Sequence, residues 1–174
     1  LDYRIGLIEM FSLLTARRFH GLVAVVAFAL LAVAFYMEYQ MGLEPCPLCM
    51  LQRIAFFCIG VVALISAVHR AASATKFYAI GVVIFSLLGA ALSLRHLYLQ
   101  NLPTEELPAC LPGLGYMLEV FPWQEIMQAM IMGTGECGDV LWTFLGLSIP
   151  GWTLVAFASL ALTNLLIVVS QRQK

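Results

Sequence analysis

The sequence predicts an all-α membrane protein, a four-transmembrane-helix bundle with one long outer loop. Of its 174 residues, 62% are hydrophobic and 11% are charged, which leaves too little polar surface for a water-soluble globule. Four apolar runs, at about residues 21–37, 50–68, 77–94 and 152–170, approach the roughly 20 helical residues that cross about 30 Å of hydrocarbon. Continuous apolar runs suit helices better than the alternating strands of a barrel. We therefore expect one integral membrane domain over residues 1–174.

The first apolar run, at residues 21–37, has two interpretations. Arg17 and Arg18, the run itself and an Ala-Val-Ala sequence at 32–34 resemble a secretory signal with its cleavage site. The run is longer than the roughly 7 to 15 residues of a signal core. We therefore predict that it is a membrane span.

The distribution of positive charge predicts the topology. Seven of the nine Lys and Arg residues precede the first span, lie between the second and third, or end the chain: Arg4, Arg17, Arg18, Arg70, Lys76, Arg172 and Lys174. The stretch from Leu97 to Pro150 has no Lys or Arg. Because cytoplasmic loops are enriched in these residues, we expect both termini inside and the loops at about 38–49 and 95–151 outside.

The two outer loops differ greatly in length. The first, at about residues 38–49, is short and delivers a Cys-Pro-Leu-Cys motif to the start of the second span. The second, at about 95–151, holds five of the seven prolines, and loops of such length are usually functional or disordered. Behind Pro122, apolar residues recur at helical spacing: Trp123, Ile126, Met127, Met130 and Ile131. We predict a short amphipathic helix at residues 122–132, lying on the outer membrane surface or packed over the bundle ends.

Four of the five cysteines map to the outer side. Cys46 and Cys49 form a CxxC, whereas Cys110 and Cys137 lie in the long loop. Cys58 lies within the second span, where we expect it only to pack. In an oxidising compartment we expect disulfides, and pairing 46 with 49 and 110 with 137 is the simplest of three connectivities. Taken alone, Cys110 and Cys137 would suggest a disulfide that only stabilises the loop. The CxxC disfavours this interpretation, because so tight a disulfide ring constrains the chain little and is better suited to thiol exchange.

Basic side chains flank the CxxC. Arg53 follows Cys49 by one helical turn, so its guanidinium can approach the sulfur and, with the helix N-terminus, favour the thiolate. A charge beside a span suggests a function, although an arginine can also simply snorkel to the headgroups. Arg95 and His96 end the third span, where His96 either donates a hydrogen bond to a ligand carbonyl or only marks the interface. Together these features predict a relay of two dithiol pairs that passes electrons to a lipid-soluble acceptor such as a quinone.

These motifs resemble the disulfide bond formation protein B (DsbB) family. The matching features are Cys-Pro-Leu-Cys with Arg53 behind it, His96, Cys110, Cys137, and Trp142 followed by Thr-Phe-Leu-Gly-Leu. The resemblance extends from the first span to the last. It implies a thiol oxidase of the bacterial inner membrane whose active cysteines face the periplasm.

The resemblance also implies an order of action for the cysteines. A reduced DsbA-like partner would attack Cys110 and free Cys137, which would then attack Cys46 and release Cys49 as a thiolate. The net product would be disulfides in secreted proteins.

The resemblance further implies a quinone site and leaves one position in doubt. Cys49, Arg53 and His96 would bind ubiquinone or menaquinone, and no metal is expected. Gln52 stands where some members carry an acid, so a proton-handling role is not implied there. Trp142 matches the family's loop tryptophan, and we expect it to act as an interfacial anchor.

Two other functions fit part of the pattern. A reductase of the vitamin K epoxide reductase type has a similar bundle and CxxC, but the order of motifs, with the CxxC opening the second span before the loop pair, favours DsbB. A thiolate metal site built from the four outer cysteines is disfavoured, because the sequence has no His between Leu97 and Ile149 and an oxidising compartment opposes free thiolates. Beyond the DsbA-like protein, quinone and membrane lipid, we expect no nucleic-acid partner.

Overall fold

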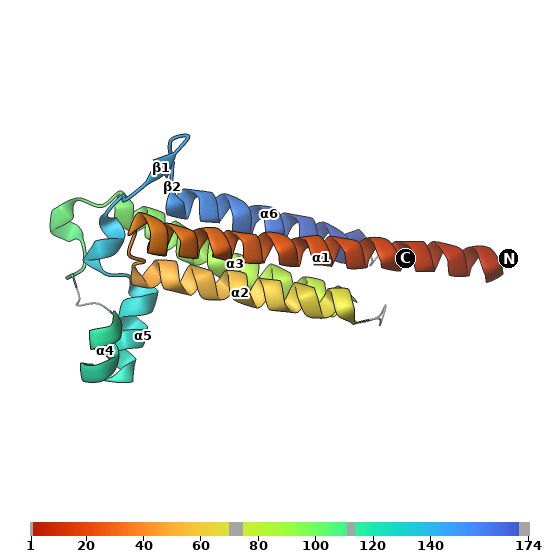
Figure 1. Ribbon diagram of the computed structural model, residues 1–174, viewed down its shortest axis with the longest axis horizontal. Helices are drawn as coiled ribbons and strands as arrows, with labels where there is room; N and C mark the ends of the chain where they lie inside the picture. Colours follow the sequence, from red (N-terminus) through yellow and green to blue (C-terminus); the bar gives the residue numbers. More distant parts are fainter. Residues whose placement is uncertain (1, 70–74, 111–113, 171–174) are drawn as a thin grey trace.

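Four long helices dominate the computed structural model, which describes residues 2–69, 75–110 and 114–170 (Figure 1). They are α1 (Asp2–Met41), α2 (Pro47–Val68), α3 (Thr75–Gln100) and α6 (Ile149–Ser170), and they run side by side. Each contains a stretch long and apolar enough to cross a membrane: Arg17–Met41, Pro47–Val68, Thr75–Gln100 and Ile149–Val169. The predicted all-α membrane fold is confirmed.

The helices extend beyond the apolar runs that predicted them. Helix α1 ends at Met41 rather than residue 37, and α3 ends at Gln100 rather than 94. Helix α2 begins at Pro47 rather than residue 50, and α6 at Ile149 rather than 152. The added turns include polar residues such as Glu38. A prediction from hydropathy ends the span before such a residue, although the backbone of α1 stays helical there. Consequently Glu38, predicted in a loop, lies on the last turns of α1.

The connections that carry the motif cysteines meet at one end of the bundle. Helix α1 begins and α6 ends at the opposite end (Figure 1). This arrangement agrees with both termini lying on one side, while the choice of the cytoplasmic side stays a prediction from charge. Arg70, Arg172 and Lys174, three of the residues on which it depends, lie outside the described residues.

Close packing fixes how α6 is rotated against its neighbours. The most extensive helix contacts are α3 with α6, α1 with α2, and α2 with α3. Phe157 of α6 is fully buried and stacks on Phe56 of α2, with ring centroids 4.0 Å apart. A Cβ at Gly89 of α3 would lie 2.4 Å from the Phe157 ring, so only glycine permits this approach. One turn earlier on α6, the same rotation brings Thr153 against Gln52 of α2.

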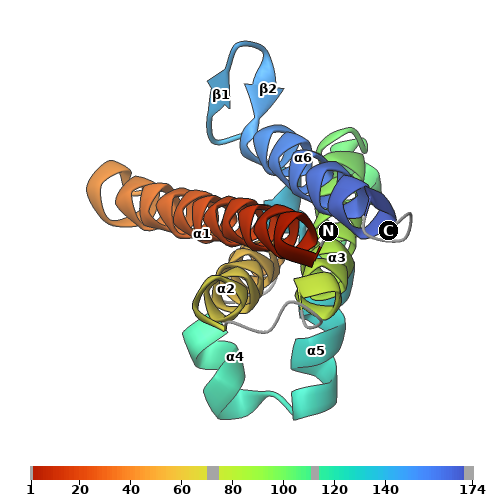
Figure 2. The same ribbon diagram turned by 90° about the vertical axis from the view of Figure 1, so that its right-hand side faces the viewer.

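The long loop contains more regular structure than the sequence predicted. It comprises η2 (Thr104–Glu106), α4 (Leu114–Val120), α5 (Trp123–Met132), η3 (Gly135–Gly138) and a hairpin of β1 (Thr143–Phe144) and β2 (Leu147–Ser148). Helix α5 is the predicted amphipathic helix, with Pro122 as its N-cap rather than its first residue. Helices α4 and α5 project to one side of the bundle end, and the hairpin projects on another side beside α6 (Figure 2).

Helix α5 packs within the protein along part of its length. It contacts α2, and its Ile126 and Ala129 form a buried cluster with Met117 of α4. Trp123 at its start is exposed. Of the two interpretations from the sequence, packing of α5 over the bundle end therefore accounts for the buried face of this helix. Contact of α5 with the membrane surface stays a prediction.

The β-hairpin, which we did not predict, carries an aromatic cluster. Its two-residue turn places both Leu145 and Gly146 at positive φ, the geometry that suits tight hairpins. Trp142 stacks on Phe144, and the Trp152 indole donates a hydrogen bond of 3.0 Å to the Phe144 carbonyl. Trp142 thus packs on the hairpin, whose Phe144 contacts Trp152 of α6, and its predicted anchoring role stays a prediction.

Candidate active site

The CxxC begins helix α2. Cys46 is the N-cap and Pro47 the first helical residue, a position where proline loses no hydrogen bond. This places Cys49 in the first turn, with its Sγ 3.3 Å from the Cys46 Sγ. All five cysteines are free thiols in this structure, so the predicted pairing stays a prediction.

A tight turn at the end of α5 brings the loop back to the CxxC. Gly133 has φ +81°, and its N–H donates to the Ala129 carbonyl. A Cβ there would lie 2.5 Å from the Leu99 side chain and 2.9 Å from that of Leu48, so a larger residue would push the following segment away. That segment is η3, which carries Cys137.

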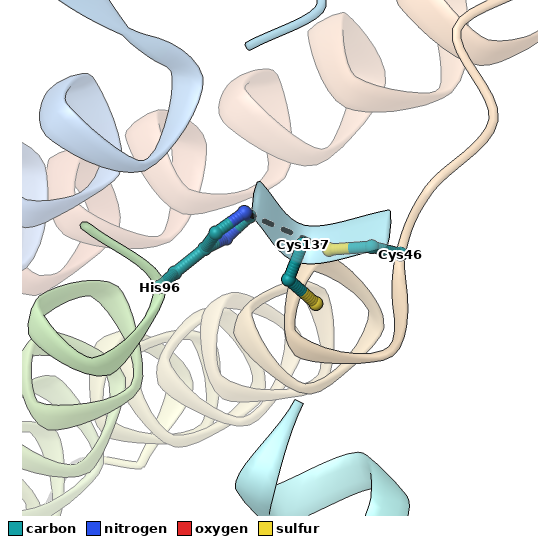
Figure 3. A group of neighbouring side chains, drawn as sticks. All are labelled: Cys46, His96 and Cys137. Carbon is teal, nitrogen blue, oxygen red and sulfur yellow. Dashed lines mark hydrogen bonds between the residues drawn. The ribbon is translucent and has the colours of Figure 1, made fainter. Parts of the chain in front are cut away.

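Cys137 and His96 meet Cys46 in a buried cluster. The two sulfurs and an imidazole nitrogen all lie within 4.8 Å of one another, and the three side chains converge from η3, α3 and the start of α2 (Figure 3). All three residues are buried. The structure therefore brings one cysteine of the loop pair to one cysteine of the CxxC, although the two are 91 positions apart in the sequence.

His96 lies between both sulfurs of the CxxC. Its Nε2 is 3.8 Å from the Cys46 Sγ, and its Nδ1 is 3.9 Å from the Cys49 Sγ. The residue is only 3% exposed, which does not fit a side chain that merely ends a span at the interface. Of the two interpretations from the sequence, burial favours a role for His96 inside the site.

The surroundings of the Cys137 thiol favour its protonated form over the thiolate. A hydrogen bond with Cys46, and then burial, raise the pKa of the Cys137 thiol above its usual range.

Cys110 is the exposed cysteine of the four. Its segment runs along η3, because the Gly135 N–H donates a 3.4 Å hydrogen bond to the Ala109 carbonyl. A Cβ at Gly135 would lie 2.8 Å from the Cys110 Sγ, so that sulfur sits against the residue two before Cys137. Cys110 thus faces solvent while its neighbour Cys137 is buried.

The environment of Arg53 differs from the prediction. The hydrogen bonds of its guanidinium within the described residues run to α1 rather than to the Cys49 sulfur. Arg53 forms an ion pair with Glu38, donates a 3.0 Å hydrogen bond to the Ala34 carbonyl, and lies 5.1 Å from the centre of the Phe35 ring. The reason is that α1 continues one turn further than its apolar run and presents Glu38 to α2.

A buried polar chain behind His96 also escaped the sequence analysis. The Gln52 amide lies 3.4 Å from the His96 Nδ1, and its Oε1 accepts a 2.7 Å hydrogen bond from the Thr153 hydroxyl. Thr153 lies 3.1 Å from Ser93, whose hydroxyl donates to the Gly89 carbonyl. Three helices, α2, α3 and α6, thereby fix the orientation of the imidazole.

Replacing Thr153 with valine tests this polar chain. The two side chains have nearly the same shape, so the main change is that a buried Gln52 oxygen loses its donor, at a cost of about 1–3 kcal/mol in unfolding free energy. Unfolding in detergent, followed by circular dichroism, measures the effect. Thr153→Ser keeps the hydroxyl and serves as the control. Equal stability of the Val and Ser variants would contradict the hydrogen bond.

Comparison with known proteins gives a consistent family. The model of the family described as disulfide bond formation protein DsbB matches residues 16–167. The disulfide bond formation protein B of Marinobacter nauticus is 47% identical over 156 residues, covering 89% of this chain and 93% of that protein. The Hahella chejuensis protein of the same name is 53% identical, with 83% and 88% covered, and the Acinetobacter baumannii protein is 38% identical, with 87% and 90% covered.

Proposed function

This chain belongs to the DsbB family of disulfide bond formation proteins, and we propose that it passes electrons from a reduced DsbA-like dithiol to a membrane quinone. Membership makes it a disulfide-forming thiol oxidoreductase. The four apolar helices make it a multi-pass membrane protein. The proposal adds the partner, the quinone, and a place in the bacterial inner membrane with the cysteines in the periplasm.

The exposure of Cys110 supports its role as the point of attack. A thiolate of the partner would attack the Cys110 sulfur of a Cys110–Cys137 disulfide, forming a mixed disulfide and releasing Cys137 as the thiolate. The second partner thiol would then displace Cys110, so that the partner leaves as a disulfide. Exposed Cys110 and buried Cys137 suit these two positions.

The position of Cys137 beside Cys46 is the observation that carries the proposal. Cys137 would attack the Cys46 sulfur of a Cys46–Cys49 disulfide, forming a Cys46–Cys137 bond and releasing Cys49 as the thiolate. Cys110 would then attack Cys137, which restores the loop disulfide and leaves the CxxC reduced. The cluster within 4.8 Å lets this exchange proceed with small movements.

The surroundings of Cys49 fit a quinone, which takes two electrons and two protons. Arg53, one turn away, carries a charge and N–H donors for a carbonyl oxygen, and the neighbouring Ile54 and Phe57 are exposed as lipid-facing residues are. His96 can deliver a proton at either CxxC sulfur. An open apolar groove of about 630 Å³ between α3 and α5 is not the proposed site, because it is lined by Leu88, Ala91, Leu92, Arg95, Ile131 and Met132, without a cysteine.

The proposal is tested with purified protein, a reduced thioredoxin-like dithiol and ubiquinone. We expect quinone absorbance to fall with turnover, and Cys49→Ser to abolish this while Cys58→Ser, a change elsewhere in α2, leaves it intact. Repeating the assay with menaquinone identifies the preferred acceptor. Absence of quinone reduction, or full activity of Cys49→Ser, would refute the proposed function.

A further inference from the structure

The cluster of Cys46, His96 and Cys137 also has the composition of a metal site. Two thiol sulfurs and an imidazole nitrogen are the ligands that Zn²⁺ prefers in proteins. They come from three separate elements yet lie within 4.8 Å of one another, and all three residues are buried. The sequence argument against a metal counted histidines only between Leu97 and Ile149, and His96 lies just before that stretch.

The spacing of the ligand atoms is close to that of a tetrahedral site. With Zn–S bonds of about 2.3 Å, neighbouring ligand atoms lie about 3.7 Å apart. The Cys46 Sγ is 3.8 Å from the His96 Nε2 and 3.3 Å from the Cys49 Sγ. Cys49, whose Sγ is also 3.9 Å from the His96 Nδ1, therefore offers a third sulfur as the fourth ligand.

We propose that the reduced protein binds one thiophilic divalent cation of the Zn²⁺ class through Cys46, Cys137 and His96, with Cys49 completing the site. Each thiol that binds releases its proton to water. The Cys46 and Cys137 thiolates balance the charge of the cation, and Cys49 adds a third thiolate, which leaves the complete site with one net negative charge. Cys110 and Cys58 take no part. This inference rests on the geometry of the cluster and not on the quinone reaction.

Gln52 is placed to support the histidine ligand. A histidine that binds a metal through Nε2 carries its proton on Nδ1 and donates it to a second group. Gln52 lies beside Nδ1, and turning its amide over presents the oxygen to that proton. The Thr153 hydroxyl, which now donates to the Gln52 oxygen, can accept from the amide nitrogen instead.

Binding is confined to the reduced protein. A Cys46–Cys49 or Cys46–Cys137 disulfide removes the sulfurs as anionic ligands, so a bound cation excludes the oxidised forms and holds the CxxC reduced. Cations of this class should therefore inhibit reoxidation of the CxxC.

The test uses Cd²⁺ as the probe and the full-length protein, reduced under anaerobic conditions in detergent. We expect one Cd²⁺ per chain by elemental analysis after desalting, with an ultraviolet cadmium–thiolate band that protein oxidised beforehand lacks. Cys137→Ser should weaken binding at least about 100-fold, and Gln52→Leu about 10- to 100-fold. Cys110→Ser and Cys58→Ser are the matched controls and should bind as the unchanged protein does.

Alkylation provides a second measurement that does not depend on the variants. With Cd²⁺ bound, Cys137 should be protected from a thiol reagent while Cys110 is still modified. No band in the reduced protein, unchanged affinity in Cys137→Ser, or loss of binding in Cys110→Ser would each overturn the proposed ligand set.

Discussion

Cys137→Ser is expected to lower electron transfer from the DsbA-like partner to quinone by at least about a thousand-fold, because no other thiol connects the loop with the CxxC. Cys137 is the buried loop cysteine, and its sulfur lies within 4.8 Å of Cys46. Without it Cys110 has no disulfide through which to accept the partner's electrons. The measurement is quinone absorbance in the coupled assay. Circular dichroism and the unfolding transition control for folding, since serine differs from cysteine by one atom.

Cys110→Ser is the matched comparison, because it also stops transfer but leaves Cys137 free. In this variant Cys137 should attack the CxxC and form a Cys46–Cys137 disulfide, which peptide mapping without reduction detects. The geometry favours Cys46 over Cys49 as the target, because Cys46 and not Cys49 shares the buried cluster with Cys137. A Cys49–Cys137 bond, or transfer by Cys137→Ser at the normal rate, would contradict the relay.

The helices could be predicted from the sequence because the membrane sets both their length and their composition. Their ends could not. Hydropathy stops at residue 37 because Glu38 follows, but the backbone of α1 continues to Met41. Because of this difference of one turn, the sequence did not predict Glu38 as the partner of Arg53, since only the longer α1 presents Glu38 to α2.

The contacts between site residues on different helices also could not be predicted from the sequence. Spacing along one helix relates Cys49 to Arg53, whereas the contact between Gln52 and Thr153 depends on how α6 is rotated about its axis. That rotation follows from Phe157 lying over Gly89, a packing detail without a motif. Gln52 had two signals, its place in the family motif and its uncharged polar side chain within an apolar helix, and neither identifies Thr153 as its partner.

The hairpin and α4 were missed for a local reason. The turn of the hairpin uses Leu145 at positive φ, and leucine gives no turn signal. Helix α4 spans only Leu114–Val120, and contact with α5 stabilises it through Met117. Such short elements depend on their neighbours for stability, so local sequence predicts them poorly.

Arg53→Met is expected to lower both stability and quinone reduction. The Arg53 and Glu38 side chains are 14% and 24% exposed, and removing one partner leaves a largely buried charge unpaired. Fully buried pairs cost about 3–5 kcal/mol when broken in this way, so about 2 kcal/mol is expected at this partly exposed pair. Loss of a positive donor beside the Cys49 thiolate and the quinone should lower turnover about 100-fold.

The double variant Arg53→Met with Glu38→Leu separates these two effects. Replacing an ion pair by apolar side chains is often neutral for stability, so the double variant should regain most of the unfolding free energy. It should not regain quinone reduction, because the positive charge one turn from Cys49 is still missing. Glu38→Gln keeps an oxygen for the guanidinium, so it should cost less stability than Arg53→Met and should keep quinone reduction. If the double variant recovered turnover along with stability, Arg53 would serve only to join α1 to α2, and the quinone site would have to lie elsewhere.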